Sequence, residues 1–148
     1  MFTFNGIVYE VINGNEVRLY KTEGLKRPVR NIPAEVEYEG KKYKVTQVFG
    51  GKRRTWEDYW SGYRKSETTC GAFENDEILT NLSLPETFTK INSPMLNEKE
   101  DVYGHSTGAF KGCVKLKDIY FPNSLTEIGL AAFKNCTAIE SLYFGDNL

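Results

Sequence analysis

An internal repeat is the feature that most constrains how this chain can fold. Residues 108–121 are echoed by residues 131–144, and the match places Phe110 and Phe133 23 residues apart. A self-match at a fixed period of about 20–50 residues is the signature of stacked repeats, each of which buries its apolar side only against its neighbours. The sequence therefore predicts a solenoid whose core is a narrow column.

Two weaker copies precede this pair. Residues 71–91 repeat residues 108–128 at a constant offset of 37, with Asp76 at the position of Cys113. A fragment of a fourth copy lies within residues 32–48. We expect all the copies to contribute to one continuous apolar stripe.

Each copy predicts a short strand followed by a tight helical turn, so the expected fold class is α/β. Alternation places Ile119 and Phe121 on one face of a strand, and Pro122 ends the strand because proline cannot donate to a ladder. Residues 130–136 predict the helical turn that directs Phe133 inward. Stacking then predicts parallel pairing of three strands, at residues 82–84, 119–121 and 142–144.

The N-terminal residues follow a different pattern. Residues 2–12 and 16–20 alternate apolar and polar side chains on either side of Asn13-Gly14-Asn15, which predicts an antiparallel β-hairpin. Residues 35–44 predict a second hairpin. A solenoid needs a cap over the open end of its core, and the first hairpin is suited to that position.

These patterns predict one domain over residues 1–148, with a hairpin cap at residues 1–31 and repeats at residues 32–148. Two insertions, at about residues 51–69 and 93–106, interrupt the repeats at the same phase. Because equal phase in a stack means the same side, we expect both insertions to emerge on one edge. Insertions that cluster on one side often form the binding face.

The first insertion holds both tryptophans and a cluster of basic residues. Residues 52–65 contain five basic and two acidic side chains, a net +3 in a chain whose formal charge is −1. Trp, Tyr and Arg are enriched at binding hot spots, so we interpret this insertion as a recognition loop for an acidic protein surface or a glycan. The expected partner-binding residues are Arg53, Arg54, Trp56, Tyr59, Trp60, Tyr63 and Arg64.

The same insertion has a second interpretation. Trp56, Tyr59, Trp60 and Tyr63 have the i, i+3, i+4, i+7 spacing that is typical of a short amphipathic helix. Such a helix would pack its aromatic side on the body and present only its basic residues outward. The second insertion is polar and acidic, and it would partly neutralise the basic one beside it.

The repeat motifs resemble the BspA-like leucine-rich repeat family. The resemblance rests on Gly-Ala-Phe-x-x-Cys-x-x-Leu at residues 108–116, its echo at residues 131–139, and Phe-Pro-x-Ser-Leu-Thr-x-Ile-Gly at residues 121–129. Residues 4–9 are similar to the cap that precedes such repeats. The resemblance implies a leucine-rich-repeat solenoid and a protein-binding adhesion module of a bacterial surface or secreted protein, with a host extracellular protein as the partner. It brings no catalytic residues.

Two other functions stay open at this point: a carbohydrate-binding module that uses exposed Trp, and a structural spacer within a larger protein. The first residues lack a signal peptide, so a cytoplasmic location is the alternative to a secreted chain whose leader has been removed. The near-neutral charge argues against nucleic acid as a partner. No apolar run approaches the roughly 20 residues of a membrane helix.

The last copy is incomplete, because Leu148 corresponds to Leu125. This pattern predicts either a fragment of a longer protein or end-to-end self-association through the uncapped C-terminal repeat, since an open strand edge invites pairing.

The cysteine and histidine content favours neither a metal site nor catalysis. Cys113 and Cys136 occupy equivalent positions, which suits a disulfide, half of a metal site or a ladder of small buried residues; the repeat favours the ladder. No Cys-x-x-Cys or His pair completes a zinc site, and we expect no cofactor. Cys70 and His105 would be a nucleophile pair across the two insertions, but no catalytic signature supports it and we expect no enzyme.

Overall fold

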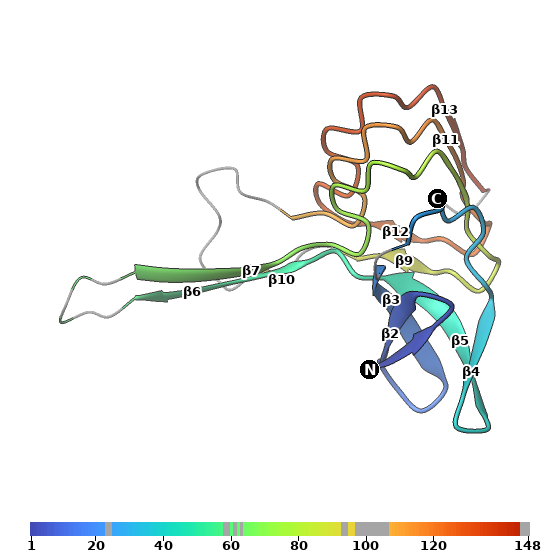
Figure 1. Ribbon diagram of the computed structural model, residues 1–148, viewed down its shortest axis with the longest axis horizontal. Helices are drawn as coiled ribbons and strands as arrows, with labels where there is room; N and C mark the ends of the chain where they lie inside the picture. Colours follow the sequence, from blue (N-terminus) through green and yellow to red (C-terminus); the bar gives the residue numbers. More distant parts are fainter. Residues whose placement is uncertain are drawn as a thin grey trace.

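The computed structural model describes residues 1–22, 25–57, 60, 62, 64–92, 95–96 and 107–145. Over these residues the chain forms strands and turns and contains no helix (Figure 1). The largest sheet contains β1 (Phe2–Phe4), β2 (Ile7–Val11), β3 (Glu16–Thr22), β4 (Glu35–Tyr38), β5 (Lys41–Val48), β9 (Lys90–Ile91) and β12 (Glu127–Ile128). The second contains β8 (Asn81–Ser83), β11 (Asp118–Tyr120) and β13 (Ser141–Tyr143). The third contains β6 (Lys52–Glu57), β7 (Arg64–Thr69) and β10 (Met95–Leu96).

Parallel strands run along the repeated part of the chain, which we call the stack (residues 71–92 and 107–145). Ile119 of β11 pairs in register with Leu82 of β8 and with Leu142 of β13. The predicted parallel pairing is confirmed, and each strand begins and ends one residue earlier than expected. In a second row, β5, β9 and β12 also pair in parallel, so the repeat copies contribute to two sheets.

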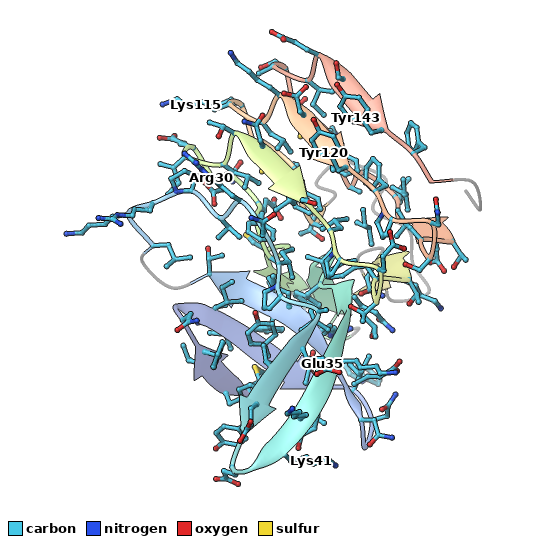
Figure 2. The ribbon with its side chains drawn as sticks, turned by 90° about the vertical axis from the view of Figure 1, so that its right-hand side faces the viewer. Arg30, Glu35, Lys41, Lys115, Tyr120 and Tyr143 are labelled. Atoms are coloured by element: carbon cyan, nitrogen blue, oxygen red, sulfur yellow. The ribbon has the colours of Figure 1, made fainter. Side chains whose placement is uncertain are left out.

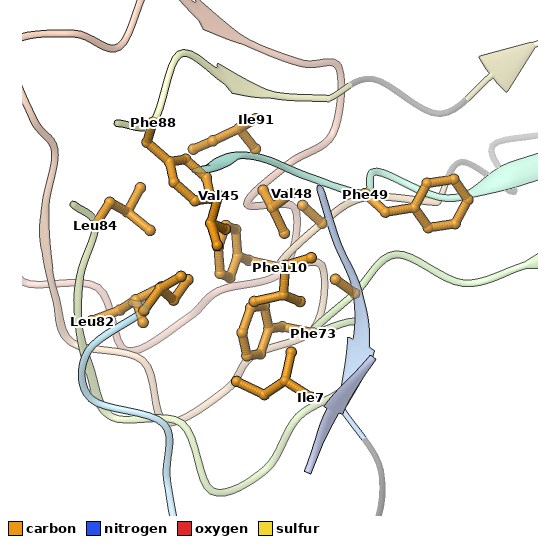
Figure 3. Close-up of a cluster of buried hydrophobic side chains, with 14 of the residues drawn as sticks. Ile7, Val45, Val48, Phe49, Phe73, Leu82, Leu84, Phe88, Ile91 and Phe110 are labelled. Carbon is orange, nitrogen blue, oxygen red and sulfur yellow. The ribbon is translucent and has the colours of Figure 1, made fainter. Parts of the chain in front are cut away.

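A column of aromatic rings fills the interior of the stack. The ring centroid of Phe110 lies 5.1 Å from that of Phe73 and 5.1 Å from that of Phe133, with the ring planes within 8° of parallel. Phe73 and Phe110 are buried among aliphatic side chains (Figure 3), whereas Phe133 is partly buried. Stacked rings at this spacing stabilise a core by about 0.5–1.5 kcal/mol beyond the burial of their area. The predicted inward position of these phenylalanines is confirmed.

The predicted helical turns are wrong, and with them the α/β class. Residues 130–136 close through single turns, in one of which the N–H of Lys134 donates to the carbonyl of Ala131 at 3.1 Å. Ala131 and Asn135 have φ angles of 56° and 61°, outside the right-handed region that an α-helix requires. The equivalent position in the preceding copy, Gly112, has a φ of 74°. These left-handed residues stop each turn before a helix can form.

Strands β2 and β3 pair antiparallel, as the sequence predicts, and β1 also pairs antiparallel with β2. The Oδ1 atom of Asn13 accepts hydrogen bonds from the N–H groups of Asn15 (2.9 Å) and Glu16 (3.0 Å), which closes the turn between β2 and β3. Strand β3 then pairs in parallel with β5, so the antiparallel strands extend the row that continues through β9 and β12. The second hairpin is confirmed, since β4 and β5 pair antiparallel around Glu39 and Gly40 (φ 50° and 75°).

Cys113 and Cys136 are free thiols that bind the backbone one copy earlier. The Sγ of Cys113 donates to the carbonyl of Phe73 at 3.0 Å, and the Sγ of Cys136 donates to the carbonyl of Phe110 at 3.0 Å. The predicted ladder is therefore confirmed, and the disulfide is excluded. A hydrogen bond with the Cys136 thiol and burial together raise the pKa of Cys113.

In the copy at residues 71–91, Asp76 stands at the position of the cysteine and makes a local contact. Its Oδ1 atom accepts hydrogen bonds from the N–H groups of Ile78 (2.8 Å) and Leu79 (3.0 Å). A short acidic side chain can close a turn on its own backbone in this way. The departure from the cysteine pattern therefore leaves the turn closed.

Candidate interaction surface

Both insertions leave the repeats on the same side. Strand β6 follows the segment after Val48, strand β10 follows Ile91, and these two residues are paired neighbours in the largest sheet. Strand β10 then pairs in parallel with β6, with Met95 opposite Lys52. The expected common edge is confirmed for these residues. Most of the second insertion, including His105, lies outside the described residues.

The first insertion is an antiparallel hairpin that projects from the rest of the molecule, and we call it the arm (β6, β7 and the residues between them). Figure 1 shows β6 and β7 running away from the repeats. The register opposes Arg54 to Glu67 and Glu57 to Arg64. The arm is therefore a β-hairpin whose two strands pair along their whole described length.

The predicted amphipathic helix is wrong at Trp56, where the helix was expected to begin. Trp56 is the fifth residue of β6 and pairs with Lys65 of β7. The aromatic spacing matches a helix, but Thr55, Thr68 and Thr69 are β-branched and favour strands. Pairing of the two flanking segments decides the local structure here.

Gly51 positions the base of the arm. It has a φ of 99°, and a Cβ atom there would lie 2.2 Å from the Oγ1 of Thr107 and 3.0 Å from the carbonyl oxygen of Thr69. Only glycine adopts this conformation and permits this approach without strain. The chain can therefore turn from the buried end of β5 into β6 while it stays against the base of β7.

Five of the seven predicted binding residues lie in described parts of the arm. Arg53, Arg54 and Trp56 belong to β6, and Arg64 begins β7. Trp60 lies between the strands and is 94% exposed. Tyr59 and Tyr63 lie outside the described residues. The side chain of Trp60 is therefore presented mainly to solvent, whereas the alternative interpretation places it against the body.

The outer face of the second sheet carries a pair of tyrosines that the sequence reasoning missed. The rings of Tyr120 and Tyr143 stack with centroids 4.4 Å apart and planes 1° from parallel, and both residues are about half exposed (Figure 2). Ser83 occupies the next position in the same row. The signal was present in the sequence, because Tyr follows Ile119 and Leu142 at equivalent positions of two matching copies, so both tyrosines fall on the opposite face of their strands. Repulsion from the ionised form of Tyr143 raises the pKa of Tyr120.

Cys70 does not have the features of an activated nucleophile. The residue as a whole is exposed. The pKa of its thiol is raised, first by partial desolvation of the thiol and second by the negative charge of Glu74. Reactive thiols have lowered pKa values, because the thiolate is the nucleophile. The proposed pairing with His105 falls outside the described residues. In the part of the chain that the structure describes, no three His, Cys, Asp or Glu side chains are grouped as a metal site would require.

The described residues also include no helix with the length and apolar character needed to span a membrane.

Comparison with known families identifies the repeats. Residues 100–148, about a third of the chain, match the model described as BspA type leucine rich repeat region (6 copies). The resemblance that the repeat motifs indicate is therefore confirmed over residues 100–148, which are similar to a BspA-type leucine-rich repeat region. Comparison with curated proteins finds no significant match.

Solved structures show distant similarity over nearly the whole chain. A leucine-rich repeat protein from Bacteroides ovatus is 24% identical, with a TM-score of 0.40, over 98% of this chain and 41% of its own. The pneumococcal vaccine antigen PcpA is 18% identical, with a TM-score of 0.48, over 99% and 38%. A leucine rich cell surface protein from Faecalibacterium prausnitzii is 14% identical, with a TM-score of 0.48, over 99% and 43%. The chain spans about two fifths of the length of these proteins.

Proposed function

We propose that this chain is a non-enzymatic protein-binding module of a bacterial surface or secreted protein, and that the arm is its recognition element. The observation that carries the proposal is the indole of Trp60, 94% exposed on a hairpin that extends from the repeats. A large aromatic side chain exposed to this extent can bury its apolar surface against a partner, and this burial stabilises the complex. A BspA-type repeat region in the same chain supports an interaction role.

The architecture that we propose for the module is a leucine-rich-repeat solenoid over residues 32–148, capped by the hairpin of residues 1–31. The phenylalanine column and the two rows of parallel strands support the solenoid. The pairing of β3 with β5, at one end of the row that continues to β9 and β12, supports the cap. A cap of this kind would keep water from the end of the core while the arm stays free to bind.

The partner that we propose is an extracellular host protein with an acidic surface. Residues 52–65 carry a net charge of +3, and basic rims attract acidic partners and speed association at low salt. We expect the aromatic contact to contribute more to affinity than the charges, because exposed ion pairs typically contribute only about 0–1 kcal/mol.

The test is binding of the chain to an immobilised panel of host matrix proteins, measured by surface plasmon resonance. We expect Trp60→Ala to weaken binding about 30-fold or more, the loss typical of a hot-spot residue. Tyr143→Ala is the matched control, because it removes an exposed aromatic ring from the sheet face and leaves the arm intact. Equal binding by wild type and Trp60→Ala would reject the arm as the binding site.

The exposed indole also supports carbohydrate binding as a second candidate function. Sugar rings stack on exposed Trp side chains, and Trp60 has the required exposure. A glycan array probed with wild type and Trp60→Ala separates the two candidates. Hits that Trp60→Ala loses would favour the glycan, and an array without hits would exclude it.

A further inference from the structure

A cavity of about 460 Å³ lies between the N-terminal hairpin and the segment that follows β3, away from the arm. Phe4, Ile7 and Leu25 contribute apolar side chains to its wall, together with the prolines and valine of residues 28–33. Small-molecule sites in proteins are concave, mostly apolar and about 300–1,000 Å³ in volume. The cavity therefore has the size and the wall of a site for a small apolar body.

Tyr9 contributes to the wall of the cavity, and its hydroxyl group lacks a partner among the described residues. The residue is fully buried. A buried hydroxyl without a partner is destabilising, and buried polar groups in native proteins are nearly always paired. Burial raises the pKa of Tyr9 to about 12, so the phenol is neutral at physiological pH and can donate a hydrogen bond.

Positive charge lies at the edge of the same cavity. Arg27 and Arg30 both line it and both are exposed, and Figure 2 shows Arg30 on the segment that leads to Ile32. None of the described residues that line the cavity is acidic. A guanidinium group beside an apolar wall suits a carboxylate, which accepts two parallel hydrogen bonds from arginine.

We propose that this cavity binds an amphipathic carboxylate, a small molecule with an apolar body and one carboxylate. The body occupies the space beside Phe4, Ile7 and Leu25, and Arg27 and Arg30 bind the carboxylate. The phenol of Tyr9 donates a hydrogen bond to an acceptor atom of the bound molecule. The combination of apolar walls, two cations and one unpaired donor selects this class over a neutral hydrocarbon or a fully hydrophilic anion.

The test uses decanoate as the probe and decanol as its neutral counterpart, with chemical-shift titration of the backbone amides by NMR. Decanoate should shift the amides of residues 25–33 in a saturable way, and decanol should bind more weakly. The affinity for decanoate should fall as salt is added, because exposed charge pairs are screened. The absence of a saturable shift with decanoate in the millimolar range would overturn the proposal.

Variants separate a ligand site from a structural hole. Tyr9→Phe should weaken decanoate binding about fivefold, the value of one neutral hydrogen bond, while the ligand-free chain keeps or gains thermal stability. The double variant Arg27→Gln, Arg30→Gln should weaken decanoate about tenfold and leave decanol unchanged. Lys115→Gln is the control for loss of a single positive charge, since this exposed lysine lies on the stack.

Two results would contradict the proposal. The first is that Tyr9→Phe and the arginine double variant both bind decanoate as tightly as wild type, which would mean that decanoate binds elsewhere. The second is that Lys115→Gln weakens decanoate binding as much as the arginine double variant does, which would show a general effect of charge and not a site. These outcomes are independent of the arm, since none of the substituted residues belongs to it.

Discussion

Phe110 lies between two other phenylalanine rings and has no exposed surface, whereas Trp60 on the arm is 94% exposed. Both are aromatic residues of one chain, but the repeat copies on either side of Phe110 enclose it. The arm interrupts the repeat, and its strands form a sheet separate from the two that run along the stack. The comparison teaches that enclosure by neighbouring repeat copies makes Phe110 a core residue, and that aromatic character alone does not.

The largest expected effect is on the stack. Phe110→Ala should lower the free energy of unfolding by about 3–5 kcal/mol, because it removes a buried ring and leaves a cavity. Phe133→Ala should cost less, since Phe133 is only partly buried. Urea unfolding followed by circular dichroism measures both. A loss below about 1 kcal/mol for Phe110→Ala would mean that this ring is not a core residue.

A second expected effect concerns burial at the N-terminal strands. The pKa of Tyr9 is raised to about 12, so the folded chain holds the phenolic proton more tightly than the unfolded chain, in which tyrosine titrates near pH 10. This contribution to stability is complete below about pH 10 and is lost as the pH rises to about 12. We expect wild type to lose on the order of 2 kcal/mol over that interval.

Tyr9→Phe is the control for this loss, because it has no phenolic proton. Unfolding in urea at several alkaline pH values should show a smaller decline for the variant than for wild type. An equal decline in both proteins would show that other groups cause it.

The third prediction tests how closely the copies approach one another. A Cβ atom on Gly108 would lie 2.1 Å from the carbonyl oxygen of Ala131, so Gly108→Ala should cost about 1–3 kcal/mol through overpacking. Gly14 has open space around it, and Gly14→Ala is the matched control with an expected change of less than about 0.5 kcal/mol. Thermal unfolding of the two variants would contradict the account if their stabilities were the same.

The smallest expected effect is on the arm. Trp60→Ala should change the free energy of unfolding by less than about 0.5 kcal/mol, because an exposed side chain contributes little to packing. Chemical denaturation gives this value. A loss comparable to that of Phe110→Ala would show that the indole is part of the core and would remove the contrast between the two regions.

Much of the stack could be predicted from the sequence, because equivalent positions must meet when copies stack. The offset of 37 between Leu82 and Ile119, and of 23 between Ile119 and Leu142, gives the observed register of β8, β11 and β13. A slip of one residue would turn every inward side chain to solvent, so the pattern tolerates no alternative. The hairpins were predictable from the local sequence, because turn residues such as Asn13 mark where the chain reverses.

The helical turns could not be predicted from local composition. Residues 130–136 contain good helix formers, but Ala131 and Asn135 adopt left-handed conformations that close each turn against its neighbour. Packing between copies overrides the local preference. The arm shows the converse problem. Its aromatic spacing fits a helix by coincidence, and only the pairing of Trp56 with Lys65 reveals strands.

The candidate sites were predictable only in part. The sequence placed the two insertions on one edge through their common phase, and the parallel pairing of β6 with β10 agrees. The sequence could not indicate that the ring of Tyr9 borders a cavity, because the cavity forms where segments distant in the sequence meet. Sites built from such meetings leave no periodic signal.

The central claim is that the repeated phenylalanines form one continuous column. Nuclear Overhauser contacts between selectively labelled rings test it most directly, because the rings of Phe110 and its two neighbours are 5.1 Å apart. The account predicts cross-peaks from the ring protons of Phe110 to those of both Phe73 and Phe133. The absence of both cross-peaks in the folded protein would contradict it.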